Sequence, residues 1–311
     1  MNQFLLPPPQ AADMQQIEQI MLDRLNTQPA VAGVAGPRIE AVTHGRLRAA
    51  LVLLGAGLLN YRSSGVTHAA AAVELIYAAT STHHDLVNAV ERRRSGSPSA
   101  EPWPHGVTLM IGDYLFALAA GEMALAPDPR VIGYYSQAVA EIAEAELTPM
   151  RNVTPLDLAR EQYQVTYNGK VAALFAAAGQ AGMACCGGSP AQIEALGRFG
   201  AALGLAGQMV NEALDVESGG ANTLRQGLIC LPLIYAATRE DPDRLLAAID
   251  SKDAAEMAWA ISAAQRHGVG PAHSEAAQLI ETARAQLLPF PKSAACAGLE
   301  SLCAFVLEHG V

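Results

Sequence analysis

Two apolar stretches of the sequence each end in a cluster of polar side chains that could bind an ion. The first ends in HHDLVN at residues 83–88, with three arginines at residues 92–94, and the second ends in QMVNEALD at residues 208–215. Because residues four apart share a helical face, polar groups of each cluster point to one side. Carboxylate, amide and imidazole groups can bind a metal ion, and clustered arginines can bind an anion. The clusters therefore predict an ion-binding site where two helices end.

Each of these groups also has a structural interpretation. The arginine run is typical of a solvated or salt-bridged helix end, and Lys170 fits an ordinary surface lysine. His83 and His84 could join Asp85 or Asp215 in a transition-metal site. No HxxxH spacing accompanies them, which favours structural histidines.

The elements expected to position these clusters are helices. The chain has 311 residues, of which 51% are hydrophobic, 16% charged and 5% aromatic. This composition, with its apolar part carried by Ala and Leu, predicts closely packed helices. Apolar residues at helical spacing predict helices at 12–26, 38–62, 67–89, 107–126, 130–147, 155–184, 190–215, 224–238, 242–249, 253–267, 272–287 and 293–308. The helices at 67–89 and 190–215 are apolar almost all round and should lie at the centre.

Charge and cysteine content exclude several classes of protein. A net charge of −10 argues against nucleic acid as a partner, because phosphate contacts need clustered Lys and Arg. Five cysteines without framework spacing predict buried thiols in a reducing compartment. The N-terminal segment lacks a basic region followed by a long apolar region, so no secretory signal is expected. We therefore expect a cytoplasmic protein.

One uncharged stretch, residues 171–193, is long enough to cross a bilayer. It contains the loop sequence GGSP at residues 187–190, which would leave backbone polar groups unpaired in lipid. A buried core helix ending near Cys186 is expected instead, and no membrane span.

The order and spacing of six segments between residues 46 and 236 resemble the trans-isoprenyl diphosphate synthases, or polyprenyl synthetases. The segments are RLRAALVLLGAG, VELIYAAT with HHDLVN and an Arg pair, GDYLFALA, KVAALF, LGLAGQMVNEALDV and LPLIYA. The resemblance implies one all-α domain over residues 1–311, with residues 1–37 as an N-terminal extension and first helix. It also implies an isoprenoid-synthase-type bundle around a deep central pocket. Active members of the family join isopentenyl diphosphate to an allylic diphosphate, with magnesium ions held by two DDxxD motifs.

The sequence departs from the family at both metal motifs, which match residues 84–88 and 211–215. Of six expected aspartates, three acids remain: Asp85, Glu212 and Asp215. The degenerate positions are His84, Asn88 and Asn211. On the helix faces formed by the first and fifth motif positions, Asp215 is the single carboxylate. Since Mg²⁺ takes oxygen ligands and needs negative charge, we expect Mg²⁺ to be weakly bound or absent.

The isopentenyl diphosphate side of the family pattern is altered as well. Gly45 stands where the family has a lysine, Tyr77 where it has a histidine, and Leu228 and Cys230 where it has Lys and Thr. The groups that the resemblance still assigns to a diphosphate are Arg48, Arg93, Arg94, Lys170 and Gln208. The chain-length positions are occupied by Ala79 and Thr80, whose small side chains favour an open pocket for a long prenyl chain.

These observations favour a catalytically impaired subunit that forms a homodimer or pairs with an active prenyl diphosphate synthase and modulates it. The helix at 107–126 is the expected interface. The alternative is a noncanonical enzyme that acts on one allylic isoprenoid diphosphate, with Arg93, Arg94 and Lys170 on the diphosphate and Asp215, with Glu212 or Asp85, on one metal ion. A third hypothesis is a protein that binds an isoprenoid without chemistry.

Overall fold

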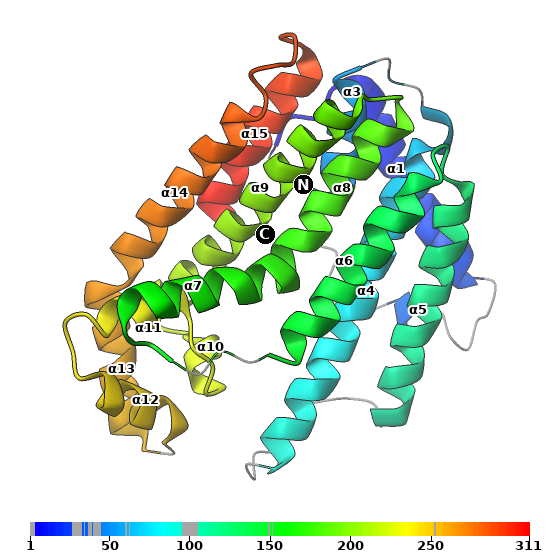
Figure 1. The fold of residues 1–311 in the computed structure, drawn as a ribbon. Coiled ribbons are helices and arrows are strands. Elements are labelled where there is room, and N and C mark those ends of the chain that lie inside the picture. The colour runs from blue at the N-terminus through cyan, green and yellow to red at the C-terminus, as the bar shows by residue number, and fades with distance from the viewer. Residues whose placement is uncertain are drawn as a thin grey trace.

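Every regular element in the described part of the chain is a helix (Figure 1). The computed structural model describes residues 4–26, 45–59, 61, 63–94, 105–148, 150, 152–251 and 253–311, with single positions 33, 35, 36 and 39. The helices are α1 (Pro8–Asn26), α3 (Leu47–Gly57), α4 (Ser63–Arg94), α5 (His105–Leu125), α6 (Arg130–Glu146), α7 (Leu156–Tyr167), the π-helical η1 (Asn168–Ala172), α8 (Ala173–Cys185), α9 (Pro190–Glu217), α10 (Asn222–Arg225), α11 (Leu231–Ala236), α12 (Pro242–Asp250), α13 (Ala254–His267), α14 (Val269–Ala285) and α15 (Ala294–His309). The predicted all-α class is confirmed.

Small residues allow the central helices to pack closely. α8 and α9 run side by side through the middle of the bundle, with α14 and α15 on one flank and α4, α5 and α6 on the other (Figure 1). A Cβ atom at Gly182 of α8 would lie 2.3 Å from the backbone oxygen of Val52 in α3, and one at Gly200 of α9 would lie 2.2 Å from that of Phe175. These contacts require glycine, and they bring the backbones together around a core of Ala and Leu.

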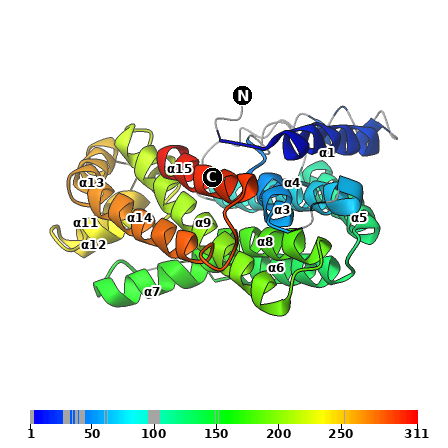
Figure 2. The ribbon, with the colours of Figure 1, turned by 90° about the horizontal axis from the view of Figure 1, so that it is seen from above.

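The helices α3 and α4, which contribute residues to the site, lie between two other layers of helices. Figure 2 shows α1 outside α3 and α4, while α6 and α8 lie on the other side of them. α4 is buried along much of its first half and packs against α5. Further along the contact between α4 and α5, the ring centroid of His83 lies 5.6 Å from that of Phe116. The His83 ring also packs on Gly112, where a Cβ atom would clash with it. His83 is thus a packing residue between α4 and α5.

Several predicted boundaries differ from the observed ones. The continuous helix expected at 224–238 is wrong, because α10 ends at Arg225 and α11 begins at Leu231, with Gly227 at a φ of 74° between them. The helix expected at 155–184 is interrupted by the π-helical η1. Among the cysteines, all of which are free, Cys185 and Cys186 are only half-buried. The core helix expected to end near Cys186 is α8, which ends at Cys185.

Among the described helices, α5 alone is long and apolar enough to cross a membrane by length and composition, over Gly106–Leu125. Only 33% of that window is buried inside the chain. A core helix of a soluble protein can have the same length and apolar composition, but it is mostly buried. The exposed apolar side chains of α5 therefore form a surface that this chain alone does not cover.

Candidate functional site

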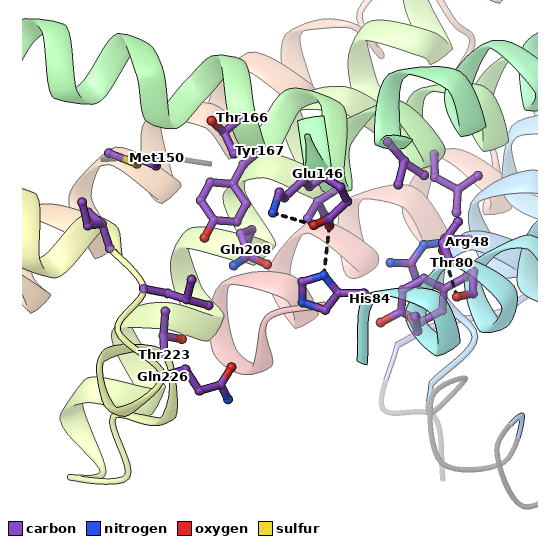
Figure 3. A pocket seen from close by; sticks show the side chains of 18 residues that line it. Arg48, Thr80, His84, Glu146, Met150, Thr166, Tyr167, Gln208, Thr223 and Gln226 are labelled. Carbon is purple, nitrogen blue, oxygen red and sulfur yellow. Dashed lines mark hydrogen bonds and ion pairs between the residues drawn. The ribbon is translucent and has the colours of Figure 1, made fainter. Parts of the chain in front are cut away.

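A cavity of about 460 Å³ lies between the central helices, where α3, α4, α6, η1 and α9 meet the segment around α10. Figure 3 shows side chains from these elements around one space. Its lining includes the charged residues Arg48, Glu146 and Lys170 and the histidine His84. The aliphatic and thioether side chains of its wall are Ile142, Met150, Val171, Leu174, Leu228 and Ile229. The cavity therefore combines a cationic region with an apolar one.

Arg48 is held between two aromatic rings at the start of α3. Its guanidinium carbon lies 3.5 Å from the ring centroid of Tyr77 and 4.4 Å from that of Phe175. The residue is only 6% exposed, and its Nε atom has no hydrogen-bond partner among the described residues. The two rings hold the guanidinium in place, and its Nε atom is itself buried, so a cavity ligand can reach Arg48 only at the small part of the group that stays exposed.

A buried carboxyl group, Glu74, supports this end of α3. The backbone N–H of Ala49 donates to Glu74 Oε1 over 2.9 Å, which satisfies one of the unpaired donors at the helix N-terminus. Burial raises the pKa of Glu74, and the nearby positive charge of Arg48 opposes that effect. Glu74 thus fixes the start of α3 and with it the position of Arg48.

The carboxylate of Glu146, at the end of α6, joins two residues of the cavity wall. His84 Nδ1 lies 3.0 Å from Glu146 Oε1 (Figure 3). Lys170 Nζ lies 2.9 Å from Glu146 Oε2. Burial by itself raises the pKa of Glu146, but the His84 and Lys170 contacts outweigh it and lower the pKa to about 2. Glu146 is therefore ionised at neutral pH. Lys170 reaches it from η1, and π-helical turns of this kind are frequent at functional sites.

Asn211, at the first position of the second metal motif, forms hydrogen bonds with residue 311. Asn211 Nδ2 donates to the backbone oxygen of Val311 over 2.8 Å, and the backbone N–H of Val311 donates to Asn211 Oδ1 over 3.2 Å. Gly207, one turn earlier on the same face of α9, leaves room for the Val311 side chain. Both polar atoms of the Asn211 side chain are thus used to hold residue 311 against α9.

The second position, Glu212, points into the protein and does not line the cavity. It is 2% exposed and accepts hydrogen bonds from the Tyr163 hydroxyl at 3.0 Å, Gln208 Nε2 at 2.9 Å and the Leu231 N–H at 2.8 Å. Burial raises its pKa to about 7, against the opposing effect of these donors. Glu212 therefore ties α7, α9 and α11 together, and part of the population carries a proton at neutral pH.

The fifth position, Asp215, stabilises the loop that follows α9. Its Oδ1 accepts a hydrogen bond from Asn222 Nδ2 at 2.8 Å, and its Oδ2 accepts one from the backbone N–H of Thr223 at 3.1 Å. A bound Mg²⁺ ion needs several oxygen ligands and charge that balances its dehydration. All three polar positions of this motif, Asn211, Glu212 and Asp215, already serve internal hydrogen bonds, so the set does not fit a Mg²⁺ site.

The structure brings together seven of the residues singled out in the sequence. The cavity is lined by Arg48, Tyr77, Thr80, His84, Lys170, Gln208 and Leu228.

Ala79, also singled out in the sequence, is fully buried in the core and is not among the residues that line the cavity. The side chains of Asp85, Asn88, Arg93 and Arg94 lie outside the described part of the chain, so their roles stay predictions.

Sequence reasoning missed Glu146 and Phe175. Glu146 is 24 residues from Lys170 and 62 from His84, so no local spacing signals the network. Phe175 belongs to KVAALF and reads as an ordinary core residue. The one available signal was chemical: a half-buried lysine needs a carboxylate partner.

The described part of the chain is thus an all-α bundle that encloses a cavity with a cationic region and an apolar wall. The polyprenyl synthetase family model matches residues 41–264. This chain belongs to the polyprenyl synthetase family.

Relatives and solved structures agree with that assignment. The chain is 27% identical over 241 residues to the octaprenyl diphosphate synthase of Escherichia coli, covering 75% of each protein. It is 30% identical over 251 residues to heptaprenyl diphosphate synthase component 2 of Geobacillus stearothermophilus, covering 76% of this chain and 78% of that protein. A polyprenyl synthase of Caulobacter crescentus, solved with calcium and isoprenyl diphosphate, superposes with a TM-score of 0.86 at 29% identity, covering 97% and 96% of the two chains.

Proposed function

We propose that this chain is a catalytically impaired polyprenyl synthetase subunit that pairs with an active prenyl diphosphate synthase in the cytoplasm and modulates it. The observation that carries the proposal is the internal use of the second metal motif. Asn211 holds residue 311, Glu212 holds α7 and α11, and Asp215 holds the loop before α10. Carboxylates or amides committed in this way are poor ligands for catalytic Mg²⁺ ions.

The exposed apolar face of α5 supports pairing. Met110 is 65% exposed and Leu109 46%, and further exposed apolar side chains lie at Val107, Leu125 and, on α6, Ile132. Large exposed apolar side chains that gather on one helix are typical of interaction sites. The related heptaprenyl diphosphate synthase of Geobacillus stearothermophilus carries the word component in its name, which is consistent with a partner subunit.

The decisive experiment combines catalysis and pairing. The purified chain, given Mg²⁺, an allylic diphosphate and isopentenyl diphosphate, should release no pyrophosphate above background. When it is co-expressed with an active polyprenyl synthetase from its own organism, the chain should co-purify with that enzyme. It should also change the length distribution or the yield of the prenyl products. Elongation by the isolated chain, or no association with any such synthetase, would contradict the proposal.

A matched pair of variants tests the surface. Met110→Glu places a charge among the exposed apolar side chains of α5. In analytical sedimentation, this variant should dissociate from the active synthetase, or from a second copy of itself if the chain forms a homodimer. Leu288→Glu changes a residue that is 83% exposed after α14 and should leave association unchanged.

The second candidate is an enzyme that acts on one allylic diphosphate, and the cationic cavity favours it. Arg48, Lys170 and the apolar wall could hold such a substrate without isopentenyl diphosphate. Release of pyrophosphate from an allylic diphosphate alone would support this candidate. Its loss in the variant Lys170→Met would assign the reaction to this cavity.

A further inference from the structure

We propose that the ring of Tyr77 masks the guanidinium of Arg48 and thereby closes the cavity to isopentenyl diphosphate. Tyr77 is then a specificity-determining residue of this chain. The inference rests on the proposed function and deepens it, because it gives a reason for the loss of elongation that does not depend on the metal motifs. Under this inference, the second candidate function relies on Lys170 and not on Arg48.

The ring of Tyr77 lies directly against Arg48. The guanidinium carbon is 3.5 Å from the centroid of the Tyr77 ring, which is a van der Waals contact, and 4.4 Å from that of the Phe175 ring. No ligand atom fits between a ring and a cation at such a separation. The side of Arg48 that meets Tyr77 is therefore occupied by the protein itself.

Burial leaves little of Arg48 for a ligand. The residue is only 6% exposed, and its Nε atom is buried. Tyr77 and Arg48 both line the cavity, but Tyr77 is only half-buried, so the aromatic ring forms more of the cavity surface there than the cation does. A diphosphate gains affinity through charge-assisted hydrogen bonds, and these need direct access to the N–H donors.

The charge of Arg48 is also balanced inside the protein. Arg48 lies close enough to the fully buried Glu74 to lower the pKa of that carboxyl group, against the larger raising effect of burial. The faces of the Tyr77 and Phe175 rings add an attraction for the cation. Arg48 is thus stabilised without an anion from the cavity.

A second position of the wall has changed in the same direction. Leu228 lines the cavity where the family pattern has a lysine, and Tyr77 stands where it has a histidine. Both changes replace a group that can carry positive charge by one that cannot. Among the described residues of the wall, Lys170 is then the accessible permanent cation. Elongation joins two diphosphates, and one ammonium group cannot hold both.

The test is to remove the ring and to measure what Arg48 then binds. The purified full-length chain is titrated calorimetrically with isopentenyl diphosphate, in parallel with the variants Tyr77→His, Tyr77→Ala and Tyr77→Phe. Tyr77→His and Tyr77→Ala should bind at least about 10-fold more tightly than the wild type, because the terminal N–H donors of Arg48 become accessible. Tyr77→Phe keeps the ring and loses only the hydroxyl group, so it should bind like the wild type.

A double variant shows whether the gain comes through Arg48. Arg48→Met alone should change the affinity of the wild type by less than about twofold, and combined with Tyr77→Ala it should abolish the gain. Circular dichroism identifies the variants that fold.

Two results would overturn the inference. One is the absence of any gain in the folded ring variants. The other is a loss of about tenfold or more in Arg48→Met alone, which would show that Arg48 is already open to the ligand and which can be measured even if the ring variants do not fold. The subunit role is judged separately by co-purification, which requires no isopentenyl diphosphate.

Discussion

The buried carboxyl group of Glu212 makes the stability of this protein depend on pH in a direction opposite to that of an ordinary paired carboxylate. Its pKa is about 7 in the folded chain and returns to its ordinary value of 4.5 on unfolding. Below pH 4.5 both states are protonated, and the group contributes its full stability. As the pH rises from 4.5 to 7, the unfolded chain releases the proton first, so the free energy of unfolding falls.

The size of this effect follows from the two pKa values. A difference of about 2.5 corresponds to about 3 kcal/mol, at about 1.4 kcal/mol for each tenfold change. The variant Glu212→Gln is isosteric and cannot ionise. Its carbonyl oxygen can accept from Tyr163 and Leu231, and Gln208 can flip its amide to accept from the new NH₂ group. The variant should therefore lose this pH dependence while keeping the fold.

The assay is urea unfolding at pH 5, 6, 7 and 8, followed by circular dichroism. The wild type should become less stable relative to Glu212→Gln by up to about 3 kcal/mol across this range. Glu300→Gln, which removes an exposed carboxylate on α15, should run parallel to the wild type. A difference between wild type and Glu212→Gln that is constant from pH 5 to 8, or that changes in the opposite direction, would refute the assignment of a buried, protonatable acid.

Three further outcomes are expected in urea unfolding. Asn211→Asp restores the family residue but removes the donor to the Val311 oxygen, so the protein should lose about 1–3 kcal/mol of stability and gain no Mg²⁺-dependent activity. Lys170→Met removes a positive partner of Glu146 and raises the pKa of that carboxyl group above about 2. The variant should therefore be less stable than the wild type at pH 6, and this difference in stability should disappear as the pH falls from 4.5 towards 2. Gly182→Ala forces a Cβ atom against a backbone oxygen of α3 and should cost about 1–3 kcal/mol, whereas equal stability would contradict the close packing of α8 on α3.

Much of the fold could be predicted because its helix starts are encoded locally. Ser189 before Pro190 predicts a helix start, and the structure has a capping box between Ser189 and Gln192 there. Asp241 before Pro242 caps α12 in the same way. The break between α10 and α11 was missed because apolar periodicity continues across it, and the positive φ at Gly227 becomes visible only in the structure.

The site could be predicted only in part. Arg48, Lys170 and His84 were found through the family pattern, and they line one cavity. Their partners could not be found, because the contacts of Glu146 and Phe175 arise from the packing of helices far apart in the sequence. The internal roles of Asn211 and Glu212 were missed for the same reason: their partners, residue 311 and Leu231, belong to other elements.

The hydrogen bonds of the second motif also restrict how this sequence can evolve. A change of Asn211 back to aspartate would sacrifice the contact with residue 311 before any other ligand of a metal site is in place. Aspartate at position 212 has a shorter side chain, so it would withdraw the carboxyl group from Tyr163 and Leu231 at the junction of three helices. Each single change should therefore cost stability, and an exchange of the whole motif for the family pattern would need several substitutions at once. In evolutionary terms, these hydrogen bonds favour retention of the present residues at positions 211 and 212.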